Sequence, residues 1–526
     1  MLKLTQIALP LGTDFTQITA LIAKAVGLQD ADIRAARLWR RSIDARHGLR
    51  FVCSFVFEAP GREDELLKRP DLKLEAFQWP EWEPPKALTP GKRVAVVGSG
   101  PAGLFCALAL SRAGLAPDIF ERGADVSGRV LALERLWSAG ELDPRSNVQF
   151  GEGGAGTFSD GKLRSGIKDK RCRYVLEALV GAGAPASILY EDNPHVGTDR
   201  LRTLLPRLRE DIEGRGGRFF FLHQVMALHP KGPKVWLDVR SSRESFCAAY
   251  DAVVLAVGHS ARDTFGMLHE AGMAMRPKAF SIGLRIEHLQ ADIDRARYRL
   301  KPGQIRPNSL PPAEYNLVTE TPSGRKVYTF CMCPGGEVVM SASTPSELVV
   351  NGMSLHARNG ANANAALLTG VGPEDFGDSH PLAGVRFQEK YEQAAFALGG
   401  RNFKAPAQTV GSFLRSGENV LGAVQPSCRT GVTLTDLSKA LPAFAVTALR
   451  EALPLLGRKL SGYEHPEALL TGVETRSSSP VRLDRDERFQ SSIASVYPCG
   501  EGAGYAGGIM SAAVDGLKVA QAILET

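Results

Sequence analysis

The clearest pattern of apolar and polar positions lies between residues 94 and 113. Apolar residues are continuous from Val94 to Val97 and then recur at 102, 105, 106, 109, 110 and 113. The first run is typical of a buried strand, and the second is typical of a helix with one face packed on a sheet. Gly98, Gly100 and Gly103 stand where the two runs meet. The pattern therefore predicts a strand, a tight turn and a helix.

The glycine spacing in this turn indicates a dinucleotide site. Gly98 allows the turn, Gly100 lets the backbone approach a pyrophosphate, and Gly103 lets helix and strand pack closely. The helix that begins at Pro101 and Ala102 presents free N–H groups to the anion. The glycines and the proline interrupt the apolar run before it reaches about 18 residues, which argues against a membrane span.

A second predicted strand, residues 116–120, ends in Glu121. An acidic side chain at this spacing is suited to hold the adenosine ribose. Arg122 and Arg129 follow, and a guanidinium just past this strand is suited to pair with the pyrophosphate. The alternative for these arginines is an ordinary surface position.

Three later segments are expected to contribute to the same site. The loop at 150–162 is rich in glycine, and Gly153 and Gly154 would let its backbone approach a flat ligand. A strand at 219–225 ends in Val225. A buried strand at 249–258 ends in Gly258, which would bring the chain back beside the first glycine turn.

The last segment repeats the arrangement of strand, loop and helix. A strand from 495 leads into a glycine loop that contains Gly500 and Glu501. Gly507, Gly508 and Ile509 then begin an amphipathic helix that reaches Leu524. Its N-terminus should point at an electron-rich group.

Between about 265 and 475 the pattern changes to strand alternation. Phe280, Ile282, Leu284 and Ile286 alternate with polar residues such as Arg285, which predicts a half-buried strand. Strands at 326–332 and 337–342, joined by 333–336, predict a hairpin. The region is interpreted as a substrate or cap domain, and it holds no second glycine-rich unit for a nicotinamide.

The N-terminal residues read as strand (2–9), helix (14–26) and two strands (33–39 and 49–57), which suggests a small ferredoxin-like α+β domain. Arg40, Arg41 and Arg46 could bind an anion, but a solvated charged turn is favoured. Proline and tryptophan at 78–85 indicate a linker, or a strap held by its tryptophans.

The expected fold class is α/β: a Rossmann-like dinucleotide-binding domain, with a β-rich cap domain and a small N-terminal α+β domain. The expected division of the chain is 1–75 for the N-terminal domain, 76–90 for the linker, 91–264 for the first part of the dinucleotide domain, 265–475 for the cap domain and 476–526 for the C-terminal part of the dinucleotide domain.

Composition narrows the class of protein. The chain has 526 residues, 44% hydrophobic and 23% charged, with a net charge of +6 that is scattered along it. Two or three globular domains are expected, and nucleic-acid binding is not indicated. The eight cysteines show no CxxC spacing, which disfavours zinc, haem, an iron–sulfur cluster or a thioredoxin-like dithiol. With no secretory signal pattern at Met1, a cytoplasmic protein with reduced thiols is expected.

These segments together resemble the FAD-binding domain of glutathione-reductase-type flavoproteins. Gly98, Gly100, Gly103 and Glu121 match the first motif of that group, residues 127–129 resemble its arginine-bearing continuation, and residues 255–258 resemble its mid-chain strand. Gly500 and Glu501 match the late motif whose acid holds the ribityl chain, with Glu where Asp is commoner. The resemblance implies FAD as the cofactor.

Over nearly the whole chain the sequence is similar to FAD-dependent dehydrogenases often labelled NAD(FAD)-utilising. The similarity rests on residues 41–46, 151–154, 258–263, 331–336, 351–354 and 500–505. This family implies little about substrate. The flavin would supply the redox chemistry, and the helix that begins at Gly507, Gly508 and Ile509 would stabilise the reduced ring.

Candidates for contact with a substrate are Lys162, His259 and Arg285. Lys162 follows the glycine loop, His259 follows the strand that ends in Gly258, and Arg285 lies on the polar face of a cap strand. A structural polar role is favoured for each one taken singly. Redox work by Cys331 with Cys333, or by Cys499, is disfavoured.

Three functions stay open at this stage. The leading one is an FAD-dependent dehydrogenase or reductase acting on a small molecule, with NADH or NADPH as an optional diffusing electron donor. The second is a flavin-dependent RNA-modifying enzyme, suggested by the arginines of the N-terminal domain. In the third, the flavin is a ligand of a non-catalytic interaction protein. Substrate, electron donor and oligomeric state are not indicated by the sequence.

Overall fold

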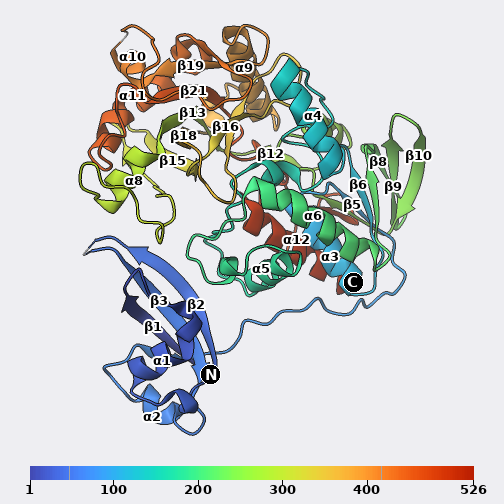
Figure 1. The fold of residues 1–526 in the computed structure, drawn as a ribbon. Helices are drawn as coiled ribbons and strands as arrows, with labels where there is room; N and C mark the ends of the chain where they lie inside the picture. The colour runs from blue at the N-terminus through green and yellow to red at the C-terminus, as the bar shows by residue number, and fades with distance from the viewer. Residues whose placement is uncertain (47, 416) are drawn as a thin grey trace.

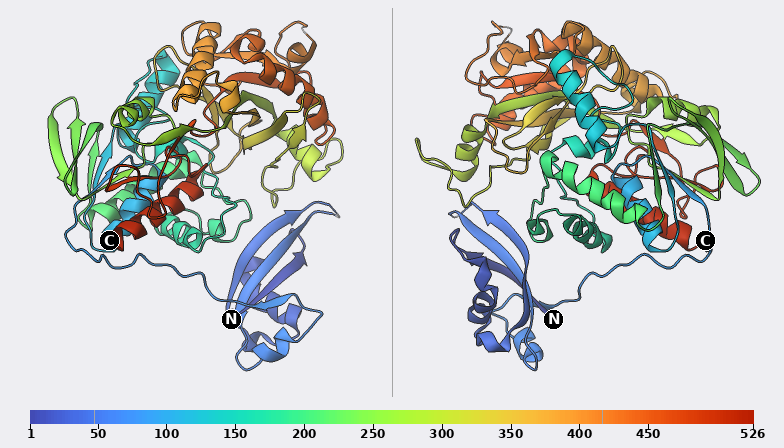
Figure 2. Two further views of the ribbon diagram at one scale, coloured as in Figure 1. Left: turned by 180° about the vertical axis from the view of Figure 1, so that it is seen from behind. Right: turned by 45° about the vertical axis from the view of Figure 1, so that its right-hand side comes forward.

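The computed structural model describes residues 1–46, 48–415 and 417–526. From residue 1 onward, the chain forms a small sheet, a long segment without regular structure, a parallel sheet covered by helices, and a larger, mainly antiparallel sheet (Figure 1). Both views of Figure 2 show the small N-terminal sheet at one end, joined to the rest by the long segment. The C-terminal helix returns to the parallel sheet.

The N-terminal sheet has strand order β2-β3-β1-β4, and every neighbouring pair is antiparallel. Helix α1 covers it because its apolar residues, Ile22 and Val26, pack into the core with Phe55 and Phe57 of β3. This is a split βαβ arrangement. Its elements are β1 (Leu2–Leu9), α1 (Ile18–Val26), β2 (Arg34–Asp44), β3 (Arg50–Glu58), α2 (Glu63–Leu67) and β4 (Leu74–Ala76).

The parallel sheet has the order β23-β11-β5-β6-β7. Helices α3, α5, α6 and α12 share a core on one of its faces, and the antiparallel strands β8, β9 and β10 pack on the other with α7. The elements before the larger sheet are β5 (Val94–Val97), α3 (Pro101–Arg112), β6 (Asp118–Glu121), α4 (Val126–Ala139), α5 (Arg171–Gly181), α6 (Thr198–Glu213), β7 (Arg218–Phe221), β8 (Gln224–Lys231), β9 (Lys234–Arg240), β10 (Ser245–Tyr250), β11 (Ala252–Leu255) and α7 (Arg262–Glu270). The chain returns to this sheet with β23 (Val496–Pro498) and α12 (Ile509–Leu524).

Two predicted strands of this region are each divided in the structure. Residues 219–225 form the end of β7 and the start of β8, with Leu222 between them at a φ of 59°. Residues 249–258 form the end of β10 and then β11, with Asp251 between them. The single-strand predictions were wrong because at both places the chain passes from one sheet layer to the other, which requires a break in the strand.

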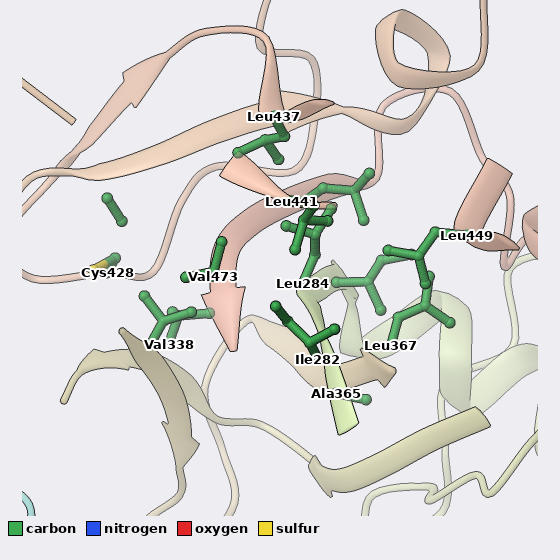
Figure 3. Packing of buried hydrophobic residues seen from close by; sticks show 14 of the residues in the cluster. Ile282, Leu284, Val338, Ala365, Leu367, Cys428, Leu437, Leu441, Leu449 and Val473 are labelled. Carbon is green, nitrogen blue, oxygen red and sulfur yellow. The ribbon is translucent and has the colours of Figure 1, made fainter. Parts of the chain in front are cut away.

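The larger sheet has the order β14-β15-β18-β13-β21-β19-β20. In Figure 3, Ile282 and Leu284 of its central strand lie beside Leu367 of β18 and Leu449 of α11, within one large apolar core. The elements of this region are β12 (Met275–Pro277), β13 (Phe280–Leu289), α8 (Gln290–Tyr298), β14 (Val318–Glu320), β15 (Lys326–Cys333), β16 (Glu337–Met340), β17 (Val350–Met353), β18 (Asn362–Val371), α9 (Ala383–Leu398), β19 (Ala405–Thr409), α10 (Val410–Arg415), β20 (Val432–Leu434), α11 (Ala443–Gly457), β21 (Leu469–Glu474) and β22 (Val481–Leu483).

Two predictions for this sheet were wrong. Strand β13 is buried on both faces up to His288, and not half-buried, because other layers cover the side that carries Arg285. Strands β15 and β16 exist, but β15 pairs with β14 and β18 whereas β16 pairs with β17. The predicted hairpin does not form because the turn at Gly335 and Gly336 packs against residues 358–362 and sends the chain out of the sheet.

Candidate functional site

One cavity of about 600 Å³ lies where the parallel sheet meets the larger sheet. Its lining comes from the β5–α3 turn, the carboxyl ends of β6 and β11, the loop after α4, the start of α12 and strands β15, β17 and β21. A ligand site at the carboxyl ends of parallel strands is the expected place in an α/β sheet. The volume is within the range of ligand pockets.

The glycine turn has the backbone that a pyrophosphate cradle requires. Gly98 has a φ of 102°, and a Cβ there would lie 2.3 Å from the carbonyl oxygen of Ala256. A Cβ on Gly103 would lie 1.9 Å from the carbonyl oxygen of Gly98, so only glycine lets α3 pack this close. Gly154 of the glycine-rich loop lies against Gly100. A Cβ on Gly154 would be 3.0 Å from Cα of Gly100.

Glu121 joins three loops at the rim of the cavity. Its carboxylate accepts hydrogen bonds from N and Oγ of Ser99 and from the N–H groups of Gly123 and Gly151, at 2.8–3.0 Å. A carboxylate has about four acceptor positions. A ribose hydroxyl would therefore have to displace a donor, and the Ser99 hydroxyl is the one that can rotate away.

The C-terminal loop closes the cavity from the other side. Gly500 has a φ of 74°, and a Cβ there would lie 2.6 Å from Cβ of Ala102. A Cβ on Gly502 would lie 2.5 Å from the carbonyl oxygen of Gly258. Gly508, in contrast, faces open space, and α12 directs the N–H groups of its first turn into the cavity. The site is thus a backbone cradle between the N-termini of two helices.

The structure brings most of the predicted cofactor residues to this cavity. Those that line it are Gly98, Gly100, Pro101, Ala102, Glu121, Arg122, Gly154, Val225, Gly258, Glu501, Gly507, Gly508 and Ile509. Gly103, Arg129, Gly153 and Gly500 are outside the lining. Gly103, Gly153 and Gly500 still shape the loops, and Gly153 donates its N–H to the Ser99 carbonyl at 2.9 Å.

Arg129 has a different place from the one predicted. It is fully buried, and its guanidinium donates to the backbone carbonyls of Asn147, Val148, Glu152 and Gly154 at 2.5–3.2 Å. Burial lowers its pKa to about 10. Arg129 is thus outside the cavity lining because its guanidinium satisfies carbonyls of the glycine-rich loop and of residues 147–148, which precede it.

Arg122 is at the cavity wall. It pairs with Asp263 at 3.0 Å, donates to Thr264 at 2.7 Å, and lies 4.5 Å over the Phe150 ring. Its guanidinium is therefore held in one position beside Glu121.

Lys162 belongs to a buried charge network next to the cavity. Its Nζ lies 2.6 Å from Asp160 and 3.8 Å from Glu314, and Arg358 pairs with the same two carboxylates. Burial disfavours the charge of Lys162, but Asp160 and Glu314 outweigh it and raise its pKa. A cation is therefore present on the cavity wall throughout the physiological pH range.

His259 provides a neutral polar group on the same wall. Burial, together with the charges of Arg476 and Arg262, lowers its pKa to about 3. Its Nδ1 lies 3.0 Å from Oγ of Ser260. The imidazole can therefore hydrogen-bond a ligand without carrying charge.

Arg285 is fully buried and does not belong to the cavity lining. It lies behind residues that sequence reasoning missed as cavity residues: Cys331, Asn351, Glu474 and Arg476. Burial raises the pKa of Glu474 to about 7, although the charge of Arg285 opposes this rise. Cys331, Asn351 and Glu474 come from three different strands, and Arg476 follows shortly after Glu474, so no single local motif could have placed all four together.

Comparison with known families agrees with this geometry. Residues 279–477 match a family described as FAD-dependent protein, C-terminal domain-like, and residues 96–143 match an NAD(P)-binding Rossmann-like domain. Residues 1–54 match a domain of unknown function. The chain is therefore a flavoprotein of oxidoreductase type with FAD as its cofactor, and the glycine cradle fits that group. Among the described residues, no helix has the length and apolarity needed to span a membrane.

Similar proteins were found among both sequences and structures. An uncharacterized protein of Clostridium beijerinckii is 44% identical over 533 residues, which cover 100% of this chain and 98% of that protein. The glutamate synthase [NADPH] small chain of Mycobacterium tuberculosis is 29% identical over 218 residues, 39% of this chain and 40% of that one.

Two solved structures show a distant likeness to the chain. A flavin-dependent brominase has a TM-score of 0.38 at 13% identity, covering 82% of this chain and 79% of its own. A geranylgeranyl bacteriochlorophyll reductase-like protein from Thermoplasma acidophilum has a TM-score of 0.37 at 13% identity, covering 82% of this chain and 78% of its own.

Proposed function

The chain belongs to the same family as the Clostridium beijerinckii protein, and for this flavoprotein we propose a hydride transfer between FAD and a small molecule bound in the same cavity. The observation that carries the proposal is that one cavity includes both the glycine cradle and polar side chains of the larger sheet domain. The finer assignments, glutathione-reductase type and NAD(FAD)-utilising dehydrogenase, are part of this proposal.

The residues that would hold the cofactor are those of the cradle. The N-terminus of α3 would bind the pyrophosphate, with Arg122 beside it. Glu121 and Glu501 would hold the sugar and ribityl hydroxyls. The N-terminus of α12 at Gly508 would stabilise negative charge on the ring. When bound, FAD supplies the redox chemistry, namely acceptance or donation of a hydride.

The residues on the substrate side would bind and orient. The permanent charge of Lys162 suits an anionic group of the substrate, such as a carboxylate. His259 is neutral and can donate or accept one hydrogen bond. Glu474, with a pKa of about 7, can hold or release a proton near neutrality.

The test is anaerobic reduction of the purified holoenzyme. NADH or NADPH is added, and flavin absorbance near about 450 nm is followed. Rapid bleaching supports a nicotinamide-linked oxidoreductase. No bleaching with either donor means that the substrate itself supplies the electrons, or that the flavin is not catalytic. A flavin that no donor reduces would overturn the proposal in favour of a non-catalytic ligand.

The RNA-modifying alternative was suggested by the arginines of the N-terminal domain. Arg40 and Arg41 pair with Asp192 and Glu191 of the next domain, which favours a structural role for these two, whereas Arg46 pairs with Asp44 and is exposed. Salt-dependent binding of tRNA would restore that alternative.

A further inference from the structure

Two cysteines stand at an irregular end of β15. The pairing of β15 with β18 shifts between Phe330 and Cys333, and Cys331 has a φ of 44°. The Cys333 thiol is directed back along the strand, where its Sγ lies 3.3 Å from the carbonyl oxygen of Cys331. The bulge therefore turns the Cys333 side chain back toward Cys331, and the two thiols interact with each other.

The two thiols differ in their access to the cavity. Cys331 is half-buried and belongs to the cavity lining, beside Asn351 and Glu474. Cys333 has no exposed surface and is outside the lining. Cys331 can therefore contact a ligand in the cavity, whereas Cys333 is shielded from it. An attacking thiol and a resolving thiol are arranged in this way.

The surroundings favour a thiolate at Cys331. A hydrogen bond from Cys333 and the charges of Arg285 and Lys162 hold the pKa of Cys331 below its usual range, although burial opposes this. The same hydrogen bond, with burial, raises the pKa of Cys333. Arg285 donates to the Cys331 carbonyl at 2.8 Å, and its Nη1 has no hydrogen-bond partner among the described residues.

The other cysteine of the cavity lacks these features. Cys499 also belongs to the lining, but burial raises its pKa well above the usual range. Its thiol therefore stays protonated, and thiols react as thiolates.

We propose that Cys331 and Cys333 form a redox-active dithiol that exchanges two electrons with the flavin, an inference that rests on FAD binding in this cavity. In the oxidative direction, the Cys331 thiolate and the Cys333 thiol would form one S–S bond, and the S–H bond of Cys333 would break. The oxidised flavin would accept the two electrons and the one proton. The reverse step regenerates both thiols. The cysteine spacing alone did not indicate this pair, because the evidence lies in the bulge and the cavity.

The test counts electrons in the air-oxidised holoenzyme by anaerobic titration with dithionite. We expect the wild type to take up four electrons per flavin, two for the ring and two for the disulfide. Cys331→Ser and Cys333→Ser should each take up two. Cys247→Ser, at an exposed position of strand β10, is the matched control and should still take up four.

A second readout does not depend on flavin reduction. After air oxidation, alkylation and mass spectrometry should find residues 331 and 333 unmodified and their peptide two hydrogens lighter. After reduction, both should be alkylated. If the wild type takes up two electrons and both thiols are alkylated in the oxidised enzyme, the dithiol is overturned while the flavin function stands. A flavin that dithionite reduces but no donor or substrate does would instead remove the proposed function alone.

Discussion

At the scale of single residues, Arg122 and Arg129 show how position decides role. Arg122 lies on the cavity wall in a salt bridge, and Arg129 is fully buried under the glycine-rich loop. The sequence places both just past the same strand, so a motif cannot distinguish them. The roles of Arg122 and Arg129 differ because the fold places buried backbone carbonyls that need a hydrogen-bond donor next to Arg129.

We expect Arg129→Met to destabilise the protein by about 3 kcal/mol or more, because several buried carbonyls of the glycine-rich loop lose their donor. Arg122→Gln is the comparison variant. It should weaken FAD binding with a small change in melting temperature, since its salt bridge is partly exposed. Thermal unfolding and flavin content measure both effects. Equal melting temperatures for the two variants would contradict the assignment.

Glu501 makes a prediction about pH. Burial raises its pKa to about 7, although Lys278 opposes the rise. The folded chain therefore holds the proton more tightly than the unfolded chain, so the associated stability is present below about pH 4.5 and is lost as pH rises through 7.

Glu501→Gln has no charge to gain. Between pH 5 and pH 8 its stability should therefore fall less than that of the wild type, by about 2–3 kcal/mol. Melting temperatures of the flavin-free proteins across this range measure the difference. Some dependence should persist because Glu474 has a similar pKa. Parallel curves for the two proteins would show that Glu501 does not titrate in this window.

The candidate site could be predicted only where it is local. Gly98, Gly100 and Gly103 predict a turn within six residues. The predicted Rossmann-like domain and FAD cofactor are confirmed. Cys331, Asn351 and Glu474 become neighbours only when β15, β17 and β21 assemble. Long-range pairing of this kind leaves no periodic signal along the chain.

At the scale of elements, the sequence predicted which residues form strands better than it predicted which strands pair. Residues 326–332 do form a strand, but its partners are β14 and β18 rather than the next strand along the chain. Pro334 and Gly335 are typical turn residues and suggested a hairpin. In the structure, Gly335 instead allows the backbone to come close to the Arg358 carbonyl. A glycine turn is compatible with both outcomes, and tertiary packing decides between them.

Helix α12 makes a prediction that separates folding from cofactor binding. A Cβ on Gly508 would meet no protein atom within 4 Å, so Gly508→Leu should fold while its side chain occupies the cavity. We expect this variant to retain no FAD, with little change in the circular dichroism spectrum. Lys518→Leu, farther along the same helix and outside the cavity lining, is the control and should retain it. A fully loaded Gly508→Leu protein would refute the role of this helix end.

At the scale of the molecule, the N-terminal sheet docks through one short stretch. Arg41 donates its N–H to the Tyr190 carbonyl at 2.7 Å, and its carbonyl accepts from Asp192 at 3.0 Å. Its guanidinium pairs with Glu191 and lies over the Phe51 ring. The sequence favoured a solvated turn here, because the acidic partner lies far away along the chain.

We expect Arg41→Gln to loosen this contact by about 1 kcal/mol. Amide exchange at Asp192 should then rise a few-fold while FAD content stays unchanged. Arg46→Gln is the matched control because Arg46 pairs with Asp44 inside its own domain. Unchanged protection of Asp192 in Arg41→Gln would show that the backbone bonds alone hold the contact.

The parallel sheet and its helices are assembled from distant parts of the chain. Strand β23 pairs with β11 and helix α12 packs on α3, although the whole larger sheet lies between them in the sequence. Gly516 of α12 packs so tightly on α3 that a Cβ there would lie 2.1 Å from the Ala102 carbonyl. The cradle is therefore complete only once α12 has been synthesised and has packed on α3. We expect a chain cut short before α12 to bind no flavin, however well its other domains fold.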